Sequence, residues 1–504
     1  APAPSASEPR RVRGGRERAV PTTPLSRVFG FGQLAAGLAV GTVGEALRRT
    51  LGRQTASASA DAAQPSGSAV LSEANAERLA QTLCRMRGAA LKLGQMLSIQ
   101  DESVVPPQLL RVLERVRQDA DVMPRRQLEQ QLEGAFGSDW RSLVAEFDDH
   151  PMAAASIGQV HRARLHDWDA LRHALPPAAW AEAVEAAGGD EEALRDLCGK
   201  EVALKIQYPG VADSIDSDLL NLKRLVTYTN LLPRGLYVDE IVRVAKLELR
   251  LECDYRREGR CTQRARELVA DDGCFAVPRV VPYLTSDRVL ATELMHGDSI
   301  DAVARMDQDT RNRVALRMLR LTVRELYEWR FMQTDPNWGN FLYDPHRDLI
   351  SLLDFGAARE FSEEFVDEYM NLVWASAEQD ADQLIASSIA LGFLTGEESP
   401  SMLRAHVDAG FVVGEPFATE GEFDFGATDM TRRVGAQGEI FMKHRLTPPP
   451  QEAYSLHRKL SGAFLVCMKL GARIRCRDAL EEAREVVLRR RRQRQARERG
   501  QGEV

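Results

Sequence analysis

Residues 333–356 read QTDPNWGNFLYDPHRDLISLLDFG and carry three polar side chains at a specific spacing. Asp335 stands five residues ahead of Asn340, and Asp354 opens a DFG triplet fourteen residues after Asn340. Between them, two strand-like runs flank a turn at Asp344–Pro345. We therefore expect a hairpin that returns Asp354 to the neighbourhood of Asn340.

A second stretch, 201–207, reads EVALKIQ and predicts a strand of alternating pattern with Lys205 among apolar neighbours. Phosphoryl transfer uses a strand lysine to neutralise phosphates, an Asn and an Asp to hold magnesium, and a further carboxylate to orient the attacking oxygen. Each piece alone arises by chance. The chain order Lys205, Asp335, Asn340, Asp354 is specific and predicts a kinase-like site.

A kinase-like domain also needs a helical glutamate to hold the strand lysine. Residues 247–260, LELRLECDYRREGR, supply Glu248, Glu252 and Glu258. A solvated acidic helix face accounts for most of these side chains. We expect at least one of the three to pair with Lys205.

Two features depart from an ordinary protein kinase. A Gly-rich loop is replaced by AAASIGQVHRA, which begins with Ala153, Ala154, Ala155 and Ser156. Alanine restricts backbone angles that glycine permits, so the phosphates would be cradled differently. After the DFG triplet, residues 357–370 pass almost directly into a predicted helix, which leaves a peptide substrate without an obvious docking platform.

Composition is that of a globular protein of two or three domains, with 504 residues, 44% hydrophobic, 28% charged and a net charge of −8. Arginines crowd both ends, including 489–499, and predict either solvated tails or contact with an anionic membrane surface. Nucleic acid is disfavoured as a partner, because no basic stripe with interleaved aromatics occurs. Seven scattered cysteines without a CxxC pair predict reduced thiols and argue against a structural metal.

The most apolar run is 28–43, where Gly37 and Gly41 form a GxxxG pattern that lets membrane helices approach closely. The run is short for a membrane span, so a buried or interfacial helix is the alternative. The chain begins at Ala1, which fits a cleaved targeting sequence or a trimmed chain.

We expect seven segments along the chain. They are a disordered basic tail (1–27), a membrane or membrane-associated helix (28–50), a linker (51–70), a helical extension (71–140), a kinase-like N-lobe with a helical insert at 166–199 (141–295), a kinase-like C-lobe (296–488) and a basic tail (489–504).

At these residues the chain resembles the UbiB family of atypical kinases, most closely the mitochondrial members required for coenzyme Q (ubiquinone) biosynthesis. The resemblance runs from about residue 72 to 485. It rests on KLGQ (92–95), AAAS (153–156), VALK (202–205), ECD (252–254), DPNWGN (335–340) and DFG (354–356), with a further similarity at 447–467.

The resemblance implies an α+β, atypical protein-kinase-like bilobal fold with a helical N-terminal extension and a mostly helical C-lobe. It implies that ATP or ADP and Mg²⁺ are the cofactors. Lys205 would pair with Glu258 and approach the phosphates, and Asp335 would occupy the catalytic loop. Asn340 and Asp354 would bind magnesium.

The resemblance also implies that Glu293 and Met295 belong to a hinge that holds adenine through backbone groups, and that Ala153, Ala154, Ala155 and Ser156 line the nucleotide.

Lys92 and Gln95 lie one turn apart in the apolar segment LKLGQMLSIQD. The simpler interpretation is a lysine that extends from a core helix to water. The resemblance instead implies an extension folded over the active site, with Glu252 and Asp254 as the partners of Lys92.

The resemblance further implies ATPase rather than protein kinase activity, in support of coenzyme Q biosynthesis proteins or their lipid intermediates. It implies a membrane surface as a partner, a homodimer through GxxxG, and the matrix side of the mitochondrial inner membrane, with a plastid or bacterial inner membrane as the alternative. The insert at 166–199 departs from the family pattern. A small-molecule or lipid-precursor kinase and a nucleotide-binding pseudokinase scaffold remain as alternative functions.

Overall fold

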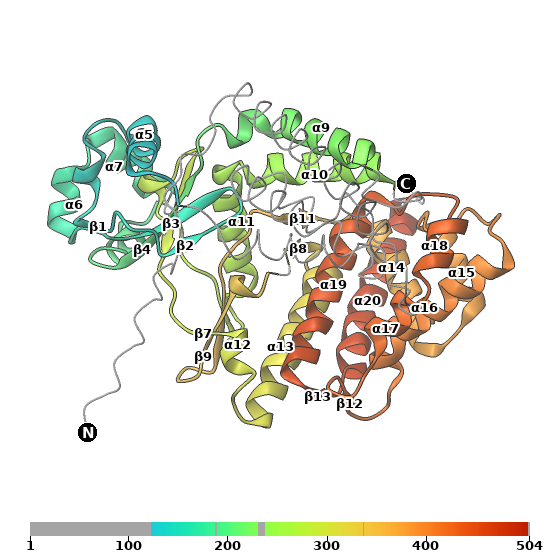
Figure 1. The fold of residues 1–504 in the computed structure, drawn as a ribbon. Helices are drawn as coiled ribbons and strands as arrows, with labels where there is room; N and C mark the ends of the chain where they lie inside the picture. Colours follow the sequence, from blue (N-terminus) through green and yellow to red (C-terminus); the bar gives the residue numbers. More distant parts are fainter. Residues whose placement is uncertain (1–121, 187–188, 230–236, 336, 502–504) are drawn as a thin grey trace, which may run out of the picture. The chain divides into compact units, whose positions relative to one another are not determined.

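The computed structural model describes residues 122–186, 189–229, 237–335 and 337–501. They divide into two compact units, whose helices and strands are labelled in Figure 1. The described residues of unit 1 are 122–186, 189–229, Val238–Gly259 and Arg279–Leu294, and those of unit 2 are Tyr237, Arg260–Pro278, 295–335 and 337–501.

Several predicted features lie outside the described residues. They are the tail 1–27, the apolar helix 28–50 with Gly37 and Gly41, the linker 51–70, most of the extension 71–140 with Lys92 and Gln95, and the last three residues of the chain.

Unit 1 is built around a five-stranded antiparallel sheet in which β1, β3, β4 and β6 are neighbours in that order and β2 pairs with β3. The strands are β1 (Glu146–Phe147), β2 (Ala153–Ala154), β3 (Gly158–Arg164), β4 (Glu201–Gln207) and β6 (Val289–Glu293). The strand predicted at 201–207 is confirmed. Val202, Leu204 and Ile206 are buried on one face of β4, so the alternation places Lys205 on the other face.

Helices of unit 1 precede, interrupt and follow this sheet. They are α5 (Arg125–Phe136), η2 (Trp140–Leu143), α6 (Trp168–Ala174), α7 (Pro177–Ala186), α8 (Glu191–Arg195), α9 (Val211–Thr229), α10 (Val238–Glu252), the first part of α11 (Tyr255–Leu268), and η3 (Pro282–Leu284). The insert predicted as helical contains α6, α7 and α8. It has a small apolar cluster of its own that includes Leu171, Leu175 and Leu194.

Unit 2 contains the predicted hairpin. Strand β9 (Phe341–Asp344) pairs antiparallel with β10 (Leu349–Leu352), and the sheet order is β5-β10-β9-β7. The other strands of unit 2 are β5 (Phe275–Ala276), β7 (Asp298–Ser299), β8 (Phe331–Gln333), β11 (Ala358–Glu360), β12 (Phe423–Asp424) and β13 (Arg473–Ile474). The pairs β8–β11 and β12–β13 form separate two-stranded ladders.

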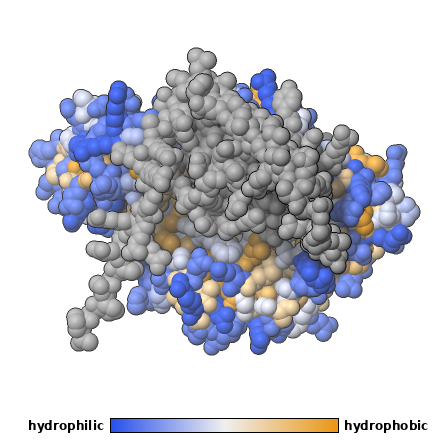
Figure 2. Space-filling model, viewed as in Figure 1, coloured by the Kyte–Doolittle hydropathy of each residue, from blue (hydrophilic) through white to orange (hydrophobic). Residues whose placement is uncertain are grey.

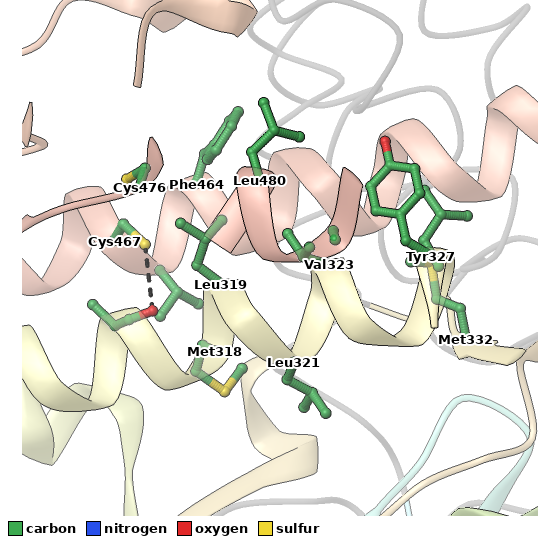
Figure 3. Close-up of a cluster of buried hydrophobic side chains, with 14 of the residues drawn as sticks. Met318, Leu319, Leu321, Val323, Tyr327, Met332, Phe464, Cys467, Cys476 and Leu480 are labelled. Carbon is green, nitrogen blue, oxygen red and sulfur yellow. Dashed lines mark hydrogen bonds between the residues drawn. The ribbon is translucent and has the colours of Figure 1, made fainter. Parts of the chain in front are cut away.

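The rest of unit 2 is helical, as expected for the C-lobe. The helices are α12 (Ile300–Val303), α13 (Gln308–Tyr327), η4 (Trp338–Asn340), α14 (Glu363–Glu378), α15 (Ala381–Ala390), α16 (Pro400–Ala418), α17 (Met430–Gly435), α18 (Gly438–His444), α19 (Gln451–Leu470) and α20 (Arg477–Gln501). Helices α13, α19 and α20 run side by side (Figure 1). Figure 3 shows their buried contact, which includes Leu319, Phe464 and Leu480.

The basic segment at the C-terminal end differs from the expected solvated tail, because α20 continues to Gln501. Arg490 and Arg494 donate hydrogen bonds to Asp367 of α14 at 2.8 and 3.1 Å, and Arg491 donates to Asn371 at 3.1 Å. Acidic and amide side chains on α14 therefore compensate part of the basic run and hold the helix against unit 2.

Hydrophilic residues cover most of the described surface visible in Figure 2, including the region of α5, α6 and α7. Within the described part of the chain, each helix falls short of the length or the apolar character that crossing a bilayer requires. The predicted membrane helix at 28–50 lies outside the described residues to which this finding applies.

Candidate active site

The predicted pairing of the strand lysine with a helical glutamate is confirmed in unit 1. Lys205 Nζ lies 2.8 Å from Oε1 and 3.0 Å from Oε2 of Glu258, so the lysine holds both carboxylate oxygens. Only 15% of the lysine side chain and 2% of the glutamate side chain are exposed. The ring of Tyr255 lies 5.3 Å from the same ammonium group, within the range of a cation–π contact.

The corner between α10 and α11 places Glu258. Asp254 Oδ1 accepts the backbone N–H of Arg257 at 2.8 Å, which caps the first turn of α11. Gln207, two residues beyond Lys205 on β4, donates to the backbone oxygen of Cys253 at 2.9 Å. This hydrogen bond joins the corner before α11 to β4, so it helps to hold Glu258 close to Lys205.

Asp254 is therefore engaged in a helix cap, and Glu252 is the last residue of α10. The predicted contact of both residues with Lys92 involves a residue outside the described part of the chain.

The Ala-rich loop forms the β2–β3 hairpin of unit 1. Ala153 and Ala154 pair with Val160 and Gln159, and the N–H of Ala155 donates to the oxygen of Gly158 at 2.8 Å. Among the described residues the loop alanines keep negative φ angles, so alanine fits this turn without left-handed strain.

Gly158 ends the turn of this hairpin where the loop meets β4. A Cβ atom at this position would lie 2.5 Å from the backbone oxygen of Ile206. Strand β3, which Gly158 begins, thus lies directly beside the strand of Lys205, and β2 pairs with the other edge of β3.

The predicted hinge residues lie at the end of β6. The N–H of Glu293 donates to the oxygen of Arg279 at 2.8 Å, and its carboxylate accepts from Lys200 at 3.3 Å. The N–H of Leu294 donates to the oxygen of Glu201 at 3.0 Å. Met295 begins the following segment in unit 2.

Asp335, Asn340 and Asp354 are brought together in unit 2. Asn340 Nδ2 donates to Asp335 Oδ2 at 3.1 Å. The register pairs Phe341 with Leu352, and the N–H of Leu353 donates to the oxygen of Asn340 at 3.0 Å. The hairpin therefore returns Asp354 beside Asn340, as its sequence predicted.

The chemistry of this group fits magnesium. Mg²⁺ prefers carboxylate and amide oxygens, and Asp354 and Asn340 supply one of each. Asn340 uses its NH₂ group toward Asp335, which leaves its amide oxygen as an acceptor. Gly356 N–H donates to Asp354 Oδ1 at 2.9 Å and fixes the carboxylate. All three side chains are half-buried, so a ligand can reach them.

The segment after the DFG triplet is short, as expected. Strand β11 begins at Ala358 and helix α14 at Glu363, with Ser362 as its N-cap. Ala358 pairs with Gln333 of β8, two residues before Asp335. The segment is thus a strand of unit 2 rather than a long exposed loop.

Sequence reasoning missed a polar group that contacts the loop of Asp335. Its members on α19 are Arg458 and Lys459, and its members elsewhere in unit 2 are Glu325, Gln333 and Thr334. The only signal in the sequence was the pair of adjacent basic residues in the segment 447–467, to which the sequence analysis assigned no role.

Two stretches of the chain match a known protein family. Residues 115–171 and 193–388 match the family described as "ABC1 atypical kinase-like domain". The unmatched residues 172–192 lie within the insert predicted at 166–199.

Two relatives and one solved structure are similar over most of the chain. "Atypical kinase COQ8B, mitochondrial" of Rattus norvegicus is 47% identical over 93% of this chain and 81% of its own length. "Atypical kinase COQ8, mitochondrial" of Saccharomyces cerevisiae is 39% identical over 93% and 86%. "The complex structure of Rv3197-erythromycin from Mycobacterium tuberculosis" has a TM-score of 0.51 at 23% identity, covering 81% of this chain and 95% of that chain, a likeness in fold alone.

Proposed function

The chain belongs to the ABC1 atypical kinase-like family, and we propose that it binds a magnesium–nucleotide complex and hydrolyses ATP. The observation that carries the proposal is the gathering of Asp335, Asn340 and Asp354 at one end of a hairpin. A complete set of metal-binding oxygens is what phosphoryl transfer requires of this segment.

Each group has a defined role in the proposed reaction. Lys205, held by Glu258, neutralises phosphate oxygens, and Asp335 orients the attacking oxygen and accepts its proton. Asn340 and Asp354 hold the metal ion through oxygen atoms. Bound magnesium would neutralise the charge that develops on the transferred phosphoryl group. The Ala-rich loop 153–156 and the backbone at Glu293 and Met295 bind the nucleotide.

The cellular role that we propose is support of coenzyme Q biosynthesis at the matrix side of the mitochondrial inner membrane. The names of the rat and yeast relatives, atypical mitochondrial kinases, and the sequence resemblance support this proposal. The proposed partners are coenzyme Q biosynthesis proteins, their lipid intermediates and the membrane surface. A GxxxG-mediated homodimer through Gly37 and Gly41 belongs to the same proposal.

A kinase acting on a small molecule or lipid precursor is the second candidate. The observation in its favour is the short segment between Gly356 and α14, which offers a peptide no long docking loop while the phosphoryl-transfer groups are retained. The same retained groups argue against a nucleotide-binding scaffold, because a scaffold has no need of a complete metal site.

Purified protein with ATP and Mg²⁺ tests the proposal, with and without liposomes and a quinone-precursor mimic. We expect phosphate release without a labelled product, and Asp354→Asn is expected to abolish it. Asp344→Asn is the matched control, because it makes the same chemical change at the turn of the same hairpin. A phosphorylated small molecule would favour the second candidate, and retained turnover in Asp354→Asn would contradict both.

A further inference from the structure

A buried ion pair joins helices α13 and α19 and takes no part in the chemistry described above. Lys459 Nζ lies 2.8 Å from Glu325 Oε2, and only 4% of the lysine and 5% of the glutamate side chain are exposed. Moving two charges out of water costs several kcal/mol per ion, and the attraction offsets this cost only when further hydrogen bonds complete the pair. The further hydrogen bonds of Lys459 and Glu325 therefore show which segment of the chain the pair stabilises.

Both members of the pair contact Gln333. Glu325 Oε1 accepts the backbone N–H of Gln333 at 3.1 Å, and Lys459 donates to Gln333 Oε1 at 3.2 Å. Gln333 ends β8, is 4% exposed and stands two residues before Asp335. The glutamate thus binds the main chain of Gln333, and the lysine binds its side chain. The base of the Asp335 loop is fixed in position and in orientation.

The neighbouring residue on α19 holds the next loop residue. Arg458, 2% exposed, donates from Nε to the backbone oxygen of Thr334 at 3.2 Å. Thr334 Oγ1 in turn donates to the oxygen of Ala357 at 2.7 Å, just after the DFG triplet. One turn of α19 therefore contacts the loop of Asp335 directly and the segment of Asp354 through Thr334.

We propose that Lys459 and Glu325 are positioning residues that, through Gln333, hold Asp335 and Asn340 in place for binding the metal ion. The fixing of the loop follows from the contacts of unit 2 alone. Its consequence for magnesium and nucleotide rests on the proposed function of Asp335 and Asn340.

The neutral double variant Lys459→Met/Glu325→Gln tests this proposal. Replacing a buried ion pair by uncharged residues of similar volume is often neutral for folding, so the variant is expected to fold with an unfolding midpoint close to that of the wild type. A glutamine at position 325 keeps an oxygen for the Gln333 N–H, whereas methionine removes the cation that orients the Gln333 side chain.

The expected result has two parts. Hydrogen–deuterium exchange of the amides of 333–335 and 337–340, measured without nucleotide, is faster in the double variant than in the wild type. The Mg²⁺ concentration at half-maximal ATP hydrolysis rises by about 10- to 100-fold, the usual effect of removing a group that orients a metal ligand. The single variant Lys459→Arg keeps a cation opposite Glu325. We expect its exchange rates and its Mg²⁺ dependence to stay close to those of the wild type. Wild-type exchange and Mg²⁺ dependence in the double variant would overturn the proposal.

Leu480→Ala is the control for general destabilisation, because it opens a cavity in the core of unit 2 without removing a polar group. We expect it to lower the unfolding midpoint and leave the Mg²⁺ dependence unchanged. An equal rise in the Mg²⁺ requirement in Leu480→Ala would overturn a specific positioning role. If the wild type neither bound nor hydrolysed ATP, the proposed function would fail, and the exchange measurement would still decide whether the pair fixes the loop.

Discussion

At the scale of single residues, the pair of Lys205 and Glu258 combines a structural and a functional demand. Glu258 is almost fully buried, and the lysine compensates the charge of its carboxylate. The lysine retains more exposure than its partner, as a group that also approaches a phosphate must. Stability and activity are therefore expected to respond differently when the pair is changed.

The single variant Lys205→Met is expected to lose ATP hydrolysis and to lower the free energy of unfolding by about 3–5 kcal/mol, because it leaves a buried carboxylate without its lysine. The double variant Lys205→Met/Glu258→Gln is expected to recover most of the stability and none of the activity. Urea unfolding and phosphate release measure the two effects. Recovery of activity in the double variant would contradict the phosphate-binding role of Lys205.

At the scale of elements, Asp348 stabilises the turn of the β9–β10 hairpin. Its φ of 50° lies in the left-handed region, which Asp adopts more readily than most residues do. Asp348 Oδ2 accepts from Arg317 at 2.7 Å, and its Oδ1 accepts from Tyr343 at 2.7 Å and Arg313 at 3.2 Å. These hydrogen bonds, that from Arg317 foremost, hold the pKa of Asp348 well below its usual range.

The lowered pKa has a defined sign for stability. A depressed folded-state pKa stabilises the fold above the unfolded value of about 3.9, and the contribution is lost as pH falls through the folded-state pKa. Asp348→Asn is expected to lower the free energy of unfolding at pH 7 by about 1 kcal/mol, a small value because the side chain is partly exposed. As pH falls below 4, the variant is expected to lose less stability than the wild type does. Urea unfolding across pH checks this, with Asp344→Asn as the control. Parallel pH profiles of wild type and variant would contradict it.

The β2–β3 hairpin is the second element with a testable property. Ala154→Gly frees backbone angles that alanine excludes, so we expect the ratio of the ATP and ADP dissociation constants to change by a factor of about 2 to 5. Ala178→Gly in α7 makes the same chemical change outside the loop. If the ratio of the ATP and ADP dissociation constants were the same in Ala154→Gly and in the wild type, this would count against the nucleotide-binding role of the loop.

At the scale of the whole molecule, local pattern and spacing predicted the parts of the site that are close in sequence. The alternation of 201–207 predicted β4, and the runs around Asp344–Pro345 predicted the hairpin that joins Asn340 to Asp354. The segment 247–260 narrowed the partner of Lys205 to three glutamates, and the resemblance selected Glu258.

Contacts between distant segments could not be predicted from one sequence. Lys459 and Gln333 are 126 residues apart, and a lysine in a helix of mixed polarity fits a surface position as well as a buried one. The continuation of α20 depends likewise on Asp367, an acidic residue of a separate helix. Both features follow from packing in unit 2.

Calorimetric titration of ATP into the purified protein, with and without Mg²⁺, measures whether the group of Asp335, Asn340 and Asp354 binds nucleotide through the metal ion. We predict that binding is at least about tenfold weaker without Mg²⁺, and that Asp354→Asn binds ATP equally weakly with and without the metal ion. Asp344→Asn is expected to behave as the wild type does. ATP affinity that is independent of Mg²⁺ in the wild type, or a full Mg²⁺ effect retained in Asp354→Asn, would contradict the account.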